Sequence, residues 1–134
     1  MLTACRILIV DDDALIAEAV SQLLTEAEAE VLGPATSIAE AKQLLKAGTP
    51  IDAALLDVNL ADGRITPVLD VLRTRHVPTV VYTGGTLPEE IGRHQQDIRL
   101  VTKPVSSAHL VRELKAVMED VAHVQSQVTY RDRR

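Results

Sequence analysis

The sequence predicts one α/β domain in which five strands alternate with helices around a parallel sheet. Short apolar runs recur along the 134 residues, and segments with helical spacing of apolar residues follow them. Strands that alternate with helices require a parallel sheet with right-handed crossovers. The chain has no Phe or Trp and only two Tyr, so the core must be aliphatic.

The first half of the chain supplies three predicted strands, Arg6–Val10, Val31–Ala35 and Asp52–Asp57. The second of these contains Gly33-Pro34, which suits the edge of a sheet. Asp13 is well placed as the N-cap of the first helix. The segment from Ser37 to Glu40 has the capping-box pattern that opens a second helix.

The second half supplies two predicted strands, Pro78–Thr83 and Ile98–Thr102. Thr66 and Pro67 are expected as the N-cap and first residue of a third helix. Thr86–Gln96 predicts only a poor helix, since it contains a glycine and few apolar residues. Ser106 is expected to cap the last helix. Residues 1–123 then form the domain, and residues 124–134 form a C-terminal tail with no output domain.

Five alternations give the flavodoxin-like (βα)5 fold, doubly wound, with strand order 2-1-3-4-5. Its switch point lies between the first and third strands, and ligands bind at the carboxyl ends of strands there. The first strand is followed by Asp11 and Asp12, and the third ends at Asp57. Topology and charge therefore indicate the same crevice.

These carboxylates predict a metal site. Two such charges about 4 Å apart repel by roughly 4 kcal/mol at an effective dielectric constant near 20. Either raised pKa values or a bound cation is expected. Oxygen ligands without His or Cys favour Mg²⁺. Asp11 and Asp12 would form the acidic pocket, with at least one of them a ligand, while Asp57 and the backbone carbonyl of Asn59 would be further ligands.

The same site could form an aspartyl phosphate. A carboxylate such as Asp57 can attack phosphorus as a nucleophile. The phosphoryl group then needs neutralisation of its charge, which Lys103 could supply, and a hydroxyl donor such as Thr83. Each residue alone is weak support. Their order at successive strand ends is what carries the interpretation.

Composition narrows the partners and the compartment. The formal net charge of −5 argues against nucleic acid as a partner. No signal peptide and no apolar run long enough to span a membrane is visible, so no membrane association is expected. A single cysteine, Cys5, cannot form an internal disulfide, which favours a reducing cytoplasm.

Over about residues 5 to 122 the chain resembles response-regulator receiver domains. The matching motifs are Ile7-Leu8-Ile9-Val10-Asp11-Asp12-Asp13, Leu55-Leu56-Asp57-Val58-Asn59-Leu60-Ala61-Asp62-Gly63, Tyr82-Thr83-Gly84 and Thr102-Lys103-Pro104. The resemblance implies that Asp57 accepts a phosphoryl group from the phosphohistidine of a sensor histidine kinase, with Mg²⁺ required. It also implies that Thr83 and Lys103 reorganise around that group. A stand-alone regulator of this kind signals by protein–protein interaction or by onward phosphotransfer.

Two departures from the family pattern stand out. Receivers usually have an aromatic residue three positions before the lysine, where this chain has Leu100. The short segment between Thr83 and Lys103 is similar to that of stand-alone "FAT GUY" receivers, which are linked to kinases of the HWE and related families. The aromatic residues of that motif are replaced by Val81 and Thr86.

Two other functions fit parts of the sequence. A pseudo-receiver would keep the fold and bind partners without being phosphorylated. A phosphatase of the haloacid-dehalogenase type also uses a strand-end Asp and Mg²⁺, but it needs a second Asp two residues later. In this chain the residue two positions after Asp57 is Asn59. We therefore expect a signalling protein that catalyses at most its own phosphorylation and dephosphorylation, and not an enzyme with a separate substrate. The sequence leaves the oligomeric state open.

Overall fold

The computed structural model of the chain describes residues 4–60, 63–83, 98–102 and 106–132, and for residues 59, 83, 102 and 120–132 it describes the backbone alone. Its main sheet has five strands: β1 (Arg6–Val10), β2 (Glu30–Ala35), β3 (Ala53–Asp57), β6 (Thr79–Thr83) and β7 (Ile98–Thr102). They lie in the order β2-β1-β3-β6-β7, and every neighbouring pair is parallel. Counted along the chain within this sheet, the order is the predicted 2-1-3-4-5.

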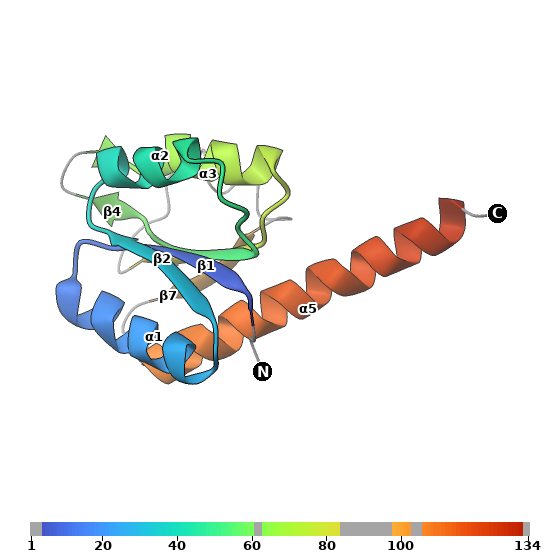
Figure 1. Cartoon of the computed structure of the whole chain (residues 1–134), viewed down its shortest axis with the longest axis horizontal. Coiled ribbons are helices and arrows are strands. Elements are labelled where there is room, and N and C mark those ends of the chain that lie inside the picture. Colours follow the sequence, from blue (N-terminus) through green and yellow to red (C-terminus); the bar gives the residue numbers. More distant parts are fainter. Residues whose placement is uncertain (1–3, 61–62, 84–97, 103–105, 133–134) are drawn as a thin grey trace.

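Helices cover both faces of this sheet, as the doubly wound prediction requires. They are α1 (Ala14–Glu26), α2 (Ile38–Lys46), α3 (Thr66–Thr74) and α5 (Ser107–Asp132). Figure 1 shows α2 and α3 on one face, with α1 and the first part of α5 on the other. The predicted helix at Thr86–Gln96 lies outside the described residues. No helix in the described part of the chain has both the length and the apolar character that crossing a membrane requires.

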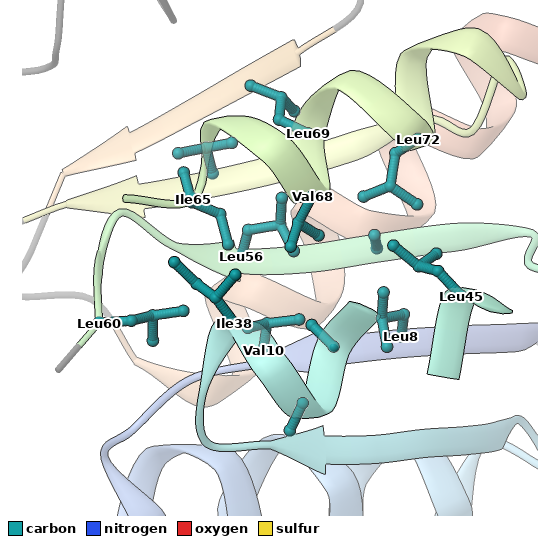
Figure 2. Close-up of a cluster of buried hydrophobic side chains, with 14 of the residues drawn as sticks. Leu8, Val10, Ile38, Leu45, Leu56, Leu60, Ile65, Val68, Leu69 and Leu72 are labelled. Atoms are coloured by element: carbon teal, nitrogen blue, oxygen red, sulfur yellow. The ribbon is translucent and has the colours of Figure 1, made fainter. Parts of the chain in front are cut away.

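The core is two mostly aliphatic layers that the sheet separates, and the second layer also holds the fully buried ring of Tyr82. Successive strand residues point to opposite faces, so Leu8, Val10 and Leu56 pack under α2 and α3 while Ile9 and Leu55 pack under α1 and α5. Figure 2 shows the first layer, in which side chains of β1 and β3 meet side chains of α2 and α3. All five of these strand residues are fully buried. The near-continuous apolar strands are what a sheet covered on both faces needs.

Most predicted helix starts are confirmed. The Asp13 carboxylate accepts hydrogen bonds from the backbone N–H of Leu15 (3.1 Å) and of Ile16 (3.4 Å). Ser37 Oγ accepts one from the N–H of Glu40 (3.1 Å), and Ser106 Oγ accepts one from the N–H of His109 (3.1 Å). These side chains satisfy backbone donors that the first turn of a helix leaves unpaired.

The predicted N-cap at Thr66 is wrong. The helix α3 includes Thr66, its N-cap is Ile65, and no side chain caps it. Ile65 already has αR backbone angles, and its carbonyl accepts hydrogen bonds from the N–H groups of Val68 and Leu69 (both 3.0 Å). Because Ile65 is fully buried beneath α3, packing rather than a polar cap fixes this helix start.

The expected end of the last helix near His123 is also wrong. The helix α5 continues through Asp132, so residues 124–132 of the predicted tail are helical. The segment from Ser107 to Asp132 contains no Gly or Pro, so nothing in it stops a helix. The strands β3 and β6 begin one residue later than predicted, and β2 begins one residue earlier.

Candidate metal centre

The ends of two adjacent strands bring the predicted acidic residues together. In the parallel ladder between β1 and β3, Val10 is paired with Leu56. The next residues along these strands are Asp11 and Asp57, which therefore emerge side by side at the carboxyl edge of the sheet. The switch point of the topology is confirmed as the place where these carboxylates meet.

The three carboxylates form one cluster. Asp11, Asp12 and Asp57 each offer a carboxylate oxygen, and these oxygens all lie within 4.8 Å of one another. The side chains of Asp11 and Asp57 are 0% and 3% exposed, whereas Asp12 is exposed. The cluster is thus buried on the side of the two strands and reaches solvent at Asp12.

Local hydrogen bonds separate the roles of the three consecutive aspartates. The backbone N–H of Asp13 donates to Asp11 Oδ1 (2.8 Å), which orients that buried carboxylate. The Asp13 side chain itself points its oxygen at the first turn of α1 and serves as the cap. Asp13 is therefore a structural residue, while Asp11 and Asp12 belong to the cluster with Asp57.

Electrostatics makes this cluster suited to a divalent cation. At 4.8 Å and an effective dielectric constant near 20, each pair of full charges repels by about 3.5 kcal/mol. A cation between the oxygens would reverse the sign of this interaction. Mg²⁺ binds oxygen ligands, takes one or two carboxylates and keeps several waters. The three carboxylates at this edge of the sheet fit that ion.

The backbone of Asn59 lies two residues beyond Asp57 in a small hairpin that sequence reasoning missed. The strands β4 (Asn59–Leu60) and β5 (Gly63–Arg64) pair antiparallel, with Leu60 opposite Gly63 and Asn59 opposite Arg64. The turn residues Ala61-Asp62-Gly63 in the sequence could have indicated that the chain reverses here.

The other predicted site residues are placed only in part. Asp57 is paired with Tyr82 across β3 and β6, so Thr83 comes one position further along the neighbouring strand, at the same edge of the sheet. The Thr83 side chain is not among the described groups. Lys103 follows the last residue of β7 and lies outside the described residues.

The structure describes Leu100, which occupies the position where receivers usually have an aromatic residue. Leu100 lies in β7, the strand at one edge of the main sheet, and its side chain is 40% exposed. This residue is thus partly in solvent in the structure.

Comparison with known proteins agrees with this geometry. The family model of the response regulator receiver domain matches residues 7–115. A response regulator receiver protein from Sinorhizobium medicae is 27% identical, with a TM-score of 0.77 over 90% of this chain and 99% of that chain. A CheY-like receiver domain protein from Methanospirillum hungatei is 26% identical, with a TM-score of 0.73 over 90% of this chain and 98% of that chain. Among curated proteins, no sequence match was found. The family match covers most of the chain, and the protein therefore belongs to the response regulator receiver domains of two-component signalling.

Proposed function

We propose that this protein is a response regulator in which Asp57 accepts a phosphoryl group from the phosphohistidine of a sensor histidine kinase. The observation that carries the proposal is the cluster of three carboxylates at the switch point, in which Asp57 is buried. The family match supports the same class of chemistry.

In the proposed reaction an Asp57 carboxylate oxygen attacks the phosphorus atom. The P–O bond of an acyl phosphate forms while the P–N bond of the phosphohistidine breaks, and the imidazole nitrogen keeps the electron pair. Asp57 must be ionised for this attack. Because its side chain is only 3% exposed, the surrounding strands hold the nucleophile in one orientation and keep bulk water away from the product.

The remaining site residues would bind Mg²⁺ and neutralise the charge of the phosphoryl group. We assign Asp11, Asp12, Asp57 and the carbonyl of Asn59 to Mg²⁺, which would offset the negative charge of the phosphoryl oxygens. Thr83 would donate its hydroxyl to one phosphoryl oxygen, and the Lys103 ammonium would pair with another. With Leu100 in place of an aromatic residue, the signal would pass through backbone movement and Thr83.

The partners follow from this role. The donor would be a histidine kinase, which we assign to the HWE or a related family from the short Thr83–Lys103 segment. The output would be an interaction with another protein or onward transfer of the phosphoryl group. Kinases use ATP, so we place the protein in the cytoplasm. The protein would turn over no substrate other than its own phosphoryl group.

The test is the intact mass of the full chain after incubation with acetyl phosphate and Mg²⁺. We expect the wild type to gain the mass of one phosphoryl group. The Asp57→Asn variant should gain none, and neither should the wild type when a chelator removes Mg²⁺. The matched control is Asp52→Asn, which removes a carboxylate from the other end of β3 and should keep the adduct. No adduct on the wild type would favour the pseudo-receiver, and steady hydrolysis of many phosphoesters would favour a phosphatase. Phosphotransfer profiling against the histidine kinases of the source organism would then identify the donor.

A further inference from the structure

The end of the edge strand β2 holds the backbone of Asp11. β2 lies beside β1 at one edge of the main sheet (Figure 1). The carbonyl oxygen of its last residue, Ala35, accepts a hydrogen bond from the backbone N–H of Asp11 (2.9 Å). The Asp11 side chain accepts a second bond from the N–H of Asp13 (2.8 Å). The position of this buried carboxylate therefore depends on where β2 places Ala35.

An extra residue in β2 sets that position. Leu8 is paired with Leu32, but Val10 is paired with Ala35, so two steps along β1 match three steps along β2. A bulge of this kind resets the alternation of side chains along a strand. Ala35 is 1% exposed and packs in the layer under α2 and α3, whereas Pro34 is exposed. The bulge thus sets a small buried residue, and not the proline, opposite the end of β1.

Glycine is required inside this bulge. Gly33 has a φ of +95°, which residues with a side chain rarely adopt. A Cβ added there would lie 2.5 Å from the backbone nitrogen of Ala35 and 3.0 Å from the backbone oxygen of Ile9. Because both atoms belong to the backbone, no rotation of a side chain can relieve these contacts. A side chain at position 33 would therefore displace the strand segments that fix Asp11.

Such a displacement matters most for a small cation. Mg²⁺ requires a near-ideal octahedron of oxygens at about 2.0–2.1 Å, whereas Ca²⁺ accepts variable geometry at about 2.3–2.6 Å. Groups that orient a metal ligand without touching the metal commonly contribute to its affinity. A shift of a few tenths of an ångström at Asp11 should therefore weaken Mg²⁺ binding more than Ca²⁺ binding.

We propose that Gly33 is a positioning residue for the metal centre, which acts through Ala35 on the backbone of Asp11. This inference rests on the proposed function, because it takes Asp11 as a ligand of Mg²⁺. It adds to the site a residue from β2, a strand that contributes no carboxylate to the acidic cluster. The role of Gly33 is to keep the bulge closed so that Asp11 stays in place for the ion.

The first test is a titration of the ¹⁵N-labelled full chain with MgCl₂, followed by amide chemical shifts, which also show that each variant is folded. Gly33→Ala should raise the Mg²⁺ dissociation constant by about tenfold, the lower end of the loss typical for groups that orient a ligand. The dissociation constant for Ca²⁺ should rise less. An equal rise for both ions would show a general loss of the site and overturn the positioning role.

Gly48→Ala is the matched control. Gly48 also has a positive φ (+73°), but a Cβ there would meet nothing within 4 Å, and the residue lies between the end of α2 and the start of β3. Both alanine variants should lower the urea midpoint, because alanine is strained at a positive φ. Only Gly33→Ala should change Mg²⁺ affinity. Equal Mg²⁺ dissociation constants for the two variants would overturn the proposal.

A second pair of variants covers the case in which Gly33→Ala does not fold. Ala35→Gly adds no atom that could clash, but it loosens the backbone that holds Asp11. It should raise the Mg²⁺ dissociation constant by about threefold. Ala54→Gly removes an equally buried methyl group from the middle of β3 and should leave the constant unchanged. The same constant for both glycine variants would contradict the role of the β2 end.

Failure of this inference differs from failure of the proposed function. A wild type that shows neither Mg²⁺ binding nor the acetyl phosphate adduct would refute the proposed function, and the role of Gly33 with it. A wild type that shows both, with Gly33→Ala and Gly48→Ala alike in Mg²⁺ affinity, would leave the proposed function in place and overturn only the role of Gly33.

Discussion

Two aspartates at opposite ends of β3 have the same side chain and opposite surroundings. Asp52 directly precedes the strand, is exposed, and accepts a hydrogen bond from the backbone N–H of Arg6 at 2.7 Å. Asp57 ends the strand, is 3% exposed, and lies with two other carboxylates. Asp57 comes five positions after Asp52 in the chain, and it lies beside two carboxylates of the same charge.

The difference between these two surroundings shows that the carboxyl edge of the sheet is less favourable for stability than the amino edge. At the amino edge, Arg6 also forms an ion pair with Glu30 (2.9 Å), so charges of opposite sign meet in solvent. At the carboxyl edge, three carboxylates of the described residues are gathered, and water screens the charges of the two buried ones poorly. A chain selected for stability alone would not place three carboxylates there, which makes this edge the functional one.

The largest expected change in the free energy of unfolding comes from a substitution of Asp57. In Mg²⁺-free buffer, Asp57→Asn should raise the free energy of unfolding by about 2 kcal/mol, because it relieves the repulsion within the cluster. Urea denaturation measures this change. Added Mg²⁺ should stabilise the wild type more than the variant and so narrow the gap between them. A variant less stable than the wild type without Mg²⁺ would contradict the assignment of repulsion to this cluster.

An intermediate effect is expected at Asp13, which is next to the cluster in sequence but caps α1. Asp13→Ala should lower the free energy of unfolding by about 1 kcal/mol through loss of the cap. Asp13→Ser removes the same charge but keeps an oxygen acceptor, so its stability should stay close to that of the wild type. If both variants gained stability, Asp13 would belong to the repulsive cluster instead.

The smallest effect is expected at Asp52. Asp52→Asn should lower the free energy of unfolding by less than about 1 kcal/mol, since the exposed carboxylate is screened and the amide oxygen can still accept from Arg6. The change should be the same with and without Mg²⁺. A gain in stability similar to that of Asp57→Asn would mean that the two ends of β3 do not differ as described.

The main sheet and its order could be predicted because hydrophobic patterning and topology rules leave few solutions. The errors lie where local signals and packing disagree. Thr66-Pro67 has the composition of a helix start, yet the buried Ile65 sets the first turn one residue earlier. The end of α5 was misplaced because loss of core-facing positions resembles a tail, although nothing in the sequence stops the helix.

The acidic cluster could be predicted for a different reason. Parallel strands align their carboxyl ends, so residues that follow neighbouring strands must meet, whatever the details of packing. That rule placed Asp11 and Asp57 together from sequence order alone. It could not show that Asp11 is fully buried while Asp12 is exposed, because burial depends on how α1 starts after Asp13.

Tyr82 is fully buried in β6 and stands directly across from Asp57 in the ladder. The chain has no Trp and one other tyrosine, Tyr130, near the end of α5. The protein thus carries a natural fluorophore one strand away from Asp57. With Tyr130 replaced by Phe, ultraviolet emission would come from this ring alone and would follow events at the neighbouring carboxylate without any attached dye.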